Sequence, residues 1–199
     1  MGQVKEYIGK VKPDWCPGCG DFAVLNALQR ALAELDIAPH NVQVVSGIGC
    51  SSNLPGFINA YGFHGLHGRS LPVATGARLG NTDLTVIATG GDGDGYGIGV
   101  GHFVHTCRRN VNMTYIVMDN QVYGLTTGQA SPTTEKDIRT KSTPEGTIEV
   151  ALNLTRHSWT PSWLASFALG LWVIELVTDS QLLKAKLHFS RVDRCNHSR

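Results

Sequence analysis

Asp92 and Asn120 are 28 positions apart, and each lies a few residues after a segment with the apolar pattern of a buried strand. Asp92 lies in the turn 90–95 (GGDGDG), and a helix and a strand are expected between the two residues. In a parallel sheet, this spacing brings both side chains to the same edge. Their oxygens suit Mg²⁺, which usually completes its shell with substrate phosphates and water. We predict a magnesium and diphosphate site, where glycines admit the phosphates and a helix N-terminus faces them; the alternative is a turn whose Asp92 only caps a helix.

Three cysteines form a second group of residues with chemical potential, Cys16 and Cys19 in WCPGCG and Cys50 in IGCS. Two thiolates of a CxxC pair and a third from another loop suit an iron–sulfur cluster, which normally takes four thiolates. Half of a zinc site and a thioredoxin-like redox pair are the alternatives. A redox CxxC should open a helix after a strand, whereas this one follows a short polar lead. The CxxC alone leaves these alternatives open, and together with the predicted magnesium site it favours a cluster. Cys107, beside Arg108 in an expected helix, is interpreted as a buried small apolar residue.

A glycine-rich segment, 64–72 (HGLHGRSLP), carries two histidines and an arginine. Arg69 is suited to a diphosphate or a substrate carboxylate, in the bidentate fashion that arginine favours; the alternative is a surface arginine in a loop. His64 and His67 are candidates for proton handling or cofactor contact, with a purely structural role as the alternative.

The elements that must position these residues alternate between helix and strand. We expect a helix from about Asp21, its N-cap, to Asp36, with Phe22, Leu25, Leu28, Leu32 and Leu35 on one face. The further expected elements are a strand at 42–45, a buried strand at 84–88, a helix at about 97–109 and a strand at 113–118. This order predicts an α/β fold, a parallel sheet flanked by helices with functional loops at the carboxyl ends of its strands.

Composition limits the classes of function. Apolar residues make up 42% of the chain and charged residues 17%, with a formal charge of +1, so the chain should fold and has no electrostatic footprint for nucleic acid. The sequence contains no run of about 18 apolar residues, so no membrane span is predicted. The N-terminus lacks the apolar core of a signal peptide, and we therefore expect a cytoplasmic protein. The low charged fraction suggests that a partner covers part of the surface.

Together, the GDG turn with its Asn-bearing strand end, the two cysteine segments and the segment 64–72 resemble the thiamine-diphosphate-binding β subunit of 2-oxoacid:ferredoxin oxidoreductases, of the 2-oxoglutarate or pyruvate class. The resemblance implies the diphosphate-domain fold for residues 1–153, with an N-terminal cluster-binding loop. It implies Asp92, Asn120 and the main-chain carbonyl of Val122 as Mg²⁺ ligands, and Cys16, Cys19 and Cys50 as ligands of a 4Fe-4S cluster. It further implies His67 and Arg69 as catalytic residues, a substrate-side loop at 124–134, and cofactor contacts from Ile48, Gly49, Cys50, Ser51, His67, Gly68, Arg69, Ser70, Gly93, Asp94, Gly124 and Leu125.

The activity implied by the resemblance is oxidative decarboxylation of a 2-oxo acid to acyl-CoA. Thiamine diphosphate carries the organic chemistry, and a cluster suits ferredoxin, which accepts one electron at a time. Coenzyme A, ferredoxin and an α subunit are the implied partners, and nucleic acid and membrane are not expected. The alternatives are the diphosphate-binding half of a cluster-free decarboxylase and an inactive fragment.

The resemblance ends near residue 153, where the composition also changes. Residues 1–153 hold 22 of the 23 glycines, and three of the four tryptophans follow. We therefore predict a boundary there, with an aberrant or divergent segment at 154–199. Cys195 is its only candidate for a fourth cluster ligand, and its neighbours do not resemble the family's ligand loop. We interpret the change as a frame slip in the gene near codon 154, with a divergent C-terminus as the alternative.

Overall fold

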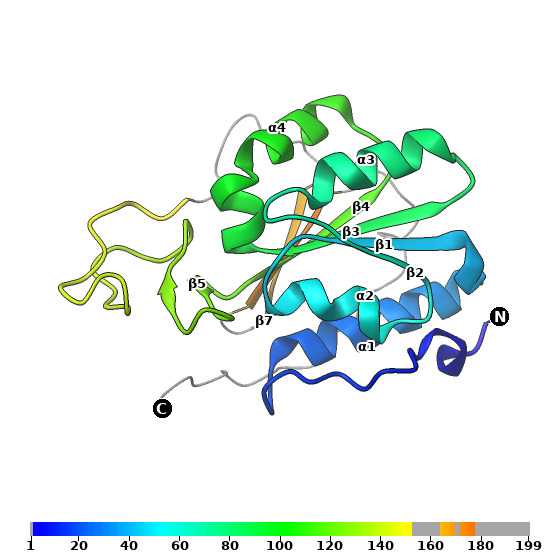
Figure 1. Ribbon diagram of the computed structural model, residues 1–199, viewed down its shortest axis with the longest axis horizontal. Coiled ribbons are helices and arrows are strands. Elements are labelled where there is room, and N and C mark those ends of the chain that lie inside the picture. Colours follow the sequence, from blue (N-terminus) through cyan, green and yellow to red (C-terminus); the bar gives the residue numbers. More distant parts are fainter. Residues whose placement is uncertain (1, 153–163, 170–171, 178–199) are drawn as a thin grey trace.

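The computed structural model describes residues 2–152, 164–169 and 172–177 (Figure 1). Its α-helices are α1 (Gly20–Glu34), α2 (Leu54–Phe57), α3 (Ser70–Gly80) and α4 (Val100–Arg109). Its strands are β1 (Val42–Ser46), β2 (Tyr61–His64), β3 (Thr85–Gly91), β4 (Thr114–Asp119), β5 (Val122–Tyr123), β6 (Gln129–Ala130), β7 (Leu164–Leu169) and β8 (Trp172–Val177). None of the helices in these ranges has the length and apolar character needed to span a bilayer.

One six-stranded sheet organises the fold, in the order β2-β1-β3-β4-β8-β7. The first four strands are parallel, as the sequence predicts. The last two are antiparallel, β8 against β4 and β7 against β8, and this pair was not predicted. Both of its strands lie in the segment 164–177, beyond the predicted boundary. The short hairpin β5–β6 stands apart from the main sheet.

Helices cover both faces of the parallel strands, α1 and α2 on one side and α3 and α4 on the other (Figure 1). Side chains of a strand alternate between the faces. On β4, Ile116 and Met118 therefore join the core under α1, whereas Tyr115 and Val117 join the core under α3 and α4. Strands β1, β3 and β4 are buried on both faces, which explains their nearly continuous apolar sequence, whereas β2 is exposed.

Helix α1 begins one residue earlier than predicted. Its N-cap is Cys19, whose backbone is extended, so the expectation that Asp21 caps the helix was wrong. The turn that joins the Cys19 N–H to the Cys16 carbonyl sets this start. Asp21 is instead buried in the first helical turn, where an acidic side chain is favourable to the helix dipole. Phe22 is 38% exposed and marks the edge of the apolar face.

The expected helix at 97–109 is divided. A π-helical turn spans Gly93–Ile98, and α4 begins at Val100 after a non-helical backbone at Gly97. Helical structure therefore begins directly after Asp92, is interrupted at Gly97, and continues as α4 to Arg109. Strand β3 extends to Gly91, so that Asp92 directly follows it. Elements β2, α2 and α3 were not predicted.

Candidate functional site

Asp92 and Asn120 follow adjacent parallel strands, as the spacing predicted. Asp92 comes directly after β3 and Asn120 directly after β4, and Gly91 is aligned with Met118 in their ladder. The two oxygen donors therefore lie at the same edge of the sheet. Their role as metal ligands stays a prediction.

The Asp92 carboxyl is buried, with 1% of the residue exposed. Burial raises the pKa of Asp92, and hydrogen bonds from Ser131 and Thr133 oppose that rise. The Thr133 hydroxyl donates to Asp92 Oδ2 over 2.8 Å. Asn120 Oδ1 accepts the Val122 N–H over 3.2 Å, and a carbonyl oxygen has a second lone pair for a cation. The side-chain oxygens of Asp92 and Asn120 are hard donors that fit Mg²⁺. Val122, whose carbonyl is the third expected ligand, is the first residue of β5.

The glycines of the turn make room for tyrosines. A Cβ on Gly93 would lie 2.2 Å from Cε1 of Tyr123, and one on Gly95 would lie 2.2 Å from the Tyr115 hydroxyl. Tyr123 also donates to the Gly93 carbonyl over 3.2 Å. The expectation that these glycines serve close approach of phosphates therefore has a competing structural explanation, the packing of two aromatic rings.

Gly124 lies where the expected magnesium ligands and the expected cluster ligands meet. A Cβ at this position would lie 3.3 Å from Nδ2 of Asn120 and 3.9 Å from Sγ of Cys50. One small residue thus separates an expected magnesium ligand from an expected cluster ligand. On the β3 side, the Ser51 hydroxyl lies 3.6 Å from the Cβ position of Gly91. The loop after β1 and the loop after β4 meet here.

Asp94 ties three strand-end loops together. Its Oδ1 accepts the N–H of Ile48 over 2.9 Å and that of Gly68 over 2.7 Å, and lies 3.0 Å from Nδ1 of His67. The carboxyl is buried, and its other oxygen has no hydrogen-bond partner within the described part of the chain. Asp94 was predicted beside the cofactor. Its contacts show an inward side chain that joins the loops after β1, β2 and β3.

The histidine and arginine segment lies at the same edge. His67 has 39% of its side chain exposed and a ring 6.2 Å from that of Tyr123. Arg69 precedes α3, and its guanidinium lies 3.5 Å from the carbonyls of Gly68 and Ile98. Its hydrogen bonds to these described residues are therefore weak. Ser70, the first residue of α3, is buried. His64 contacts the Ser46 hydroxyl at 3.2 Å, which favours a structural role.

The remaining predicted cofactor contacts are exposed or lie in a loop that requires glycine. Ile48 is 45% exposed and Leu125 is 57% exposed. Gly49 has a φ of 123° and a ψ of −176°, a conformation that is essentially restricted to glycine. The position of Cys50 therefore depends on a glycine immediately before it.

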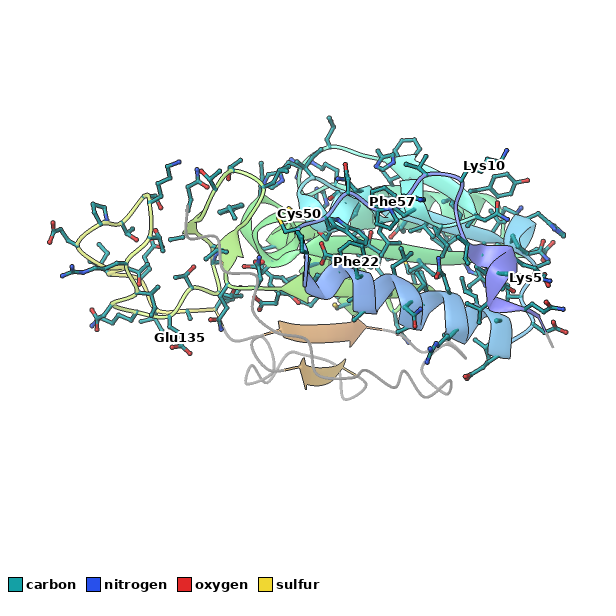
Figure 2. The ribbon with its side chains drawn as sticks, turned by 90° about the horizontal axis from the view of Figure 1, so that it is seen from below. Lys5, Lys10, Phe22, Cys50, Phe57 and Glu135 are labelled. Carbon is teal, nitrogen blue, oxygen red and sulfur yellow. The ribbon has the colours of Figure 1, made fainter. Side chains whose placement is uncertain are left out.

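Trp15 joins the two cysteine segments. Its indole N–H donates to the Cys50 carbonyl over 2.7 Å, and its ring packs edge-on against Phe22 and Phe57. Figure 2 shows Cys50, Phe22 and Phe57 near one another over the start of α1. Cys19 is buried between these segments, Cys50 is half-buried and Cys16 is exposed. Cys107 is buried in the core under α3 and α4, as interpreted from the sequence.

The cysteine loops are neighbours but not an assembled metal site. Within residues 2–152 and the two described strands of the tail, no group of three or more His, Cys, Asp and Glu side chains has an arrangement that would hold a metal ion. Cys195 lies outside the described residues.

The sequence analysis did not identify three hydroxyl residues as part of the site, Ser131, Thr133 and Thr134. All three are buried at the strand ends. They belong to the loop predicted to face the substrate, and the only signal was the grouping of hydroxyls in SPTT.

Residues 40–188 match the family described as the thiamine pyrophosphate enzyme, C-terminal TPP binding domain. This match covers most of the chain. The chain therefore belongs to that family of thiamine-diphosphate-binding domains.

Similar proteins of known name narrow the class of thiamine-diphosphate-binding domain to which the chain is related. The 2-oxoacid:ferredoxin oxidoreductase 1, subunit beta, of Aeropyrum pernix is 47% identical over 186 residues, which are 93% of this chain and 58% of the relative. The 2-oxoacid:ferredoxin oxidoreductase subunit beta of Saccharolobus solfataricus is 56% identical over 142 residues, 70% of this chain and 47% of the relative. A structure of 2-oxoglutarate:ferredoxin oxidoreductase from Magnetococcus marinus, with 2-oxoglutarate, coenzyme A and succinyl-CoA bound, has a TM-score of 0.75 and 49% identity, and covers 78% of this chain and 55% of that one.

These relatives confirm the resemblance to β subunits of 2-oxoacid:ferredoxin oxidoreductases. The chain spans about half the length of the relatives it matches. The family match and the Aeropyrum match both extend past residue 153. The boundary near Leu154 and its origin in a frame slip stay predictions.

Proposed function

We propose that the chain is the thiamine-diphosphate-binding β subunit of an enzyme that oxidatively decarboxylates 2-oxo acids to acyl-CoA, with ferredoxin as the electron acceptor. The observation that carries this proposal is the convergence at Gly124, where the Asn120 amide and the Cys50 thiol both lie close to one glycine. A decarboxylase without electron transfer has no need of a thiol at that place. The relatives named 2-oxoacid:ferredoxin oxidoreductase support the same reaction class.

In this proposal, Mg²⁺ is held by Asp92, Asn120 and the Val122 carbonyl, and it fixes the diphosphate of the cofactor. Thiamine diphosphate, when bound, supplies the carbon nucleophile and electron sink that decarboxylation of a 2-oxo acid requires. The chain's own residues bind the cofactor and orient the substrate. Arg69 is available for an anionic group because its contacts within the chain are weak. His67 is half-exposed beside the Asp94 carboxylate, a suitable place for a proton donor or acceptor.

An α subunit is part of the proposal because an apolar rim surrounds the site. We define the rim by its four exposed residues, which follow the carboxyl ends of β1, β2, β3 and β5: Ile48, Leu66, Ile98 and Leu125. Their exposures run from 45% for Ile48 to 75% for Leu66. Exposed apolar residues beside the polar groups of a site are typical of a surface that a partner covers. The cytoplasmic location expected from the sequence stays a prediction.

We also propose a 4Fe-4S cluster on Cys16, Cys19, Cys50 and a fourth ligand. The cluster would have to bring these thiols together, because among the described residues they do not form an assembled site. The proposal is tested by dye reduction with a 2-oxo acid and coenzyme A, using the full chain alone and co-expressed with an α subunit of the Aeropyrum type. We expect negligible turnover alone and turnover with the α subunit. Full turnover by the isolated chain would contradict the need for a partner, and no turnover in either preparation would contradict the activity. Iron and acid-labile sulfide in the anaerobic complex separate this enzyme from a cluster-free decarboxylase.

A further inference from the structure

One hydroxyl group links the ends of β3 and β4. The Thr133 hydroxyl lies 2.8 Å from Asp92 Oδ2 and 2.9 Å from Asp119 Oδ1, and all three residues are buried. Thr133 reaches Asp92 across 41 positions of the chain. A hydroxyl carries a single hydrogen, which is here placed between two carboxyl groups. Both carboxyl groups therefore contact the same hydroxyl, and each has a further donor, Ser131 for Asp92 and the Gln121 N–H for Asp119.

The neighbours of Thr133 fix its position. The Ser131 N–H donates to the Thr134 hydroxyl over 2.8 Å, and the Ser131 and Thr133 hydroxyls are 3.2 Å apart. The Leu152 N–H donates to the Pro132 carbonyl over 2.8 Å. We call residues 131–134 the hydroxyl latch. Its own hydrogen bonds hold the Thr133 side chain in place without any contribution from a metal.

The latch also holds the turn between the other two expected ligands. Gln121, between Asn120 and Val122, has a φ of 63°, in the left-handed region that disfavours residues with a side chain. Its N–H donates to Asp119 Oδ1 over 3.0 Å, and its carbonyl accepts the Thr134 hydroxyl over 2.5 Å. This unusual backbone is thus restrained on both sides. The Thr133 and Thr134 hydroxyls together contact both segments that would bind the ion.

We propose that Thr133 is a positioning residue that orients the Asp92 carboxylate toward Mg²⁺ and, through Asp119, couples it to the turn that carries Asn120 and Val122. The inference rests on the proposed function. Thr133 holds Oδ2 of Asp92, and this contact restrains the orientation of the carboxyl group that would bind the ion. A hydrogen-bond partner of a ligating carboxylate sets the orientation of that ligand, and its removal typically lowers metal affinity about 10–100-fold.

The test is a titration of the full chain with Mn²⁺ in the presence of thiamine diphosphate, followed by electron paramagnetic resonance. Thr133→Val removes the hydroxyl and keeps the shape, and Thr133→Ser restores the hydroxyl. Thr140→Val is the matched control, because the Thr140 hydroxyl bonds Ser142 and Thr143 in the same segment. We expect a roughly 10–100-fold weaker Mn²⁺ affinity for the valine variant at position 133 and near-parental affinity for the other two.

Affinity is measured on folded protein, so a purely structural role of Thr133 would lower the melting temperature and leave the affinity unchanged. That result would overturn the inference while the proposed function stands, provided that Asp92→Ala abolishes binding. If the parent chain itself shows no saturable binding, both are overturned. Should Thr133→Val fail to fold, Thr133→Ala, which leaves space for a water, is expected to show the same loss of affinity. Failure of both to fold, with Thr140→Val folded, would make Thr133 a residue of the fold and reject the inference.

Discussion

The strand-end site and the cysteine loops each bring together residues from distant parts of the chain, but by different means. At the strand ends, the parallel pairing of β3 and β4 and the hydroxyl latch already hold Asp92 in a hydrogen-bonded position. At the cysteine loops, the Trp15 indole bond and the edge-on packing of aromatic rings bring the two segments together, and the thiols are unevenly buried. The strand ends thus hold Asp92 by hydrogen bonds within the chain, whereas the described thiols are not arranged around one metal, and we expect the proposed cluster to draw its ligands together.

The largest effect is expected at the strand-end site. Asp92→Ala removes the one anionic ligand proposed for Mg²⁺, so Mg²⁺-dependent binding of thiamine diphosphate should be abolished. Isothermal titration calorimetry with and without Mg²⁺ measures this loss. Asp83→Ala is a suitable control, because Asp83 is an exposed carboxylate before β3. Unchanged affinity in the Asp92 variant would remove this residue from the site.

Iron content tests whether the second site is complete. Cys16, Cys19 and Cys50 supply three thiolates, while a stable cluster normally has four, so we expect substoichiometric iron after aerobic purification. The comparison is between the parent and Cys195→Ser, both prepared anaerobically. If the parent holds about four irons and the variant loses them, Cys195 is the fourth ligand. The frame-slip interpretation would then be wrong.

Much of the fold was accessible from the sequence where pattern and length agree. The helix at α1 and the strands β1, β3 and β4 were predicted because their apolar spacing is strong and glycine-rich turns bound them. Strand β2 and helix α3 were missed, since YGFH is fully exposed and the segment 64–72 has the composition of a loop. The N-cap of α1 was misplaced because the cysteine turn, rather than Asp21, starts the helix.

The candidate site, like the fold, has residues that the sequence predicted and residues that it did not. Asp92 and Asn120 were found because strand topology converts their spacing into proximity. Thr133 was not, because a contact across 41 positions from an irregular loop leaves no periodic signal. The inward role of Asp94 was also hidden, since a carboxylate in a glycine-rich turn has the same sequence signature whether it faces a ligand or the backbone of other loops.

Each region buries a carboxyl group whose pKa is raised by burial, Asp92 at the strand ends and Asp21 beside the cysteine loops. Asp92 is hydrogen-bonded, whereas Asp21 Oδ1 has no hydrogen-bond partner among the described residues. Burial raises the pKa of Asp21 to about 7, and a hydrogen bond from Cys19 only partly opposes the shift. The unfolded value is about 3.9.

Because the folded state holds this proton more tightly, the stabilisation is complete below about pH 4 and is lost as pH rises through about 7. The shift of about three pH units corresponds to a stability change of roughly 4 kcal/mol at most. Urea unfolding of the chelated, metal-free chain at pH 4 and pH 8 measures this change, because these two pH values span the range between the unfolded and the folded pKa. Asp21→Asn should flatten the difference, and parallel profiles for parent and variant would reject the assignment.

The smallest expected effect concerns the bond that links the cysteine segments. Trp15→Phe keeps an aromatic ring against Phe22 and Phe57 but removes the indole donor to the Cys50 carbonyl. A lost hydrogen bond of this kind lowers the free energy of unfolding by about 1 kcal/mol. If that bond fixes the distance between the two loops, iron should also be lost faster in air. Phe22→Leu is the control, because it removes one ring contact of Trp15, at a centroid distance of 5.3 Å, and leaves the indole bond in place. Equal rates of iron loss in both variants, measured by the decay of absorbance near 400 nm, would show that packing alone, and not the indole bond, joins the loops.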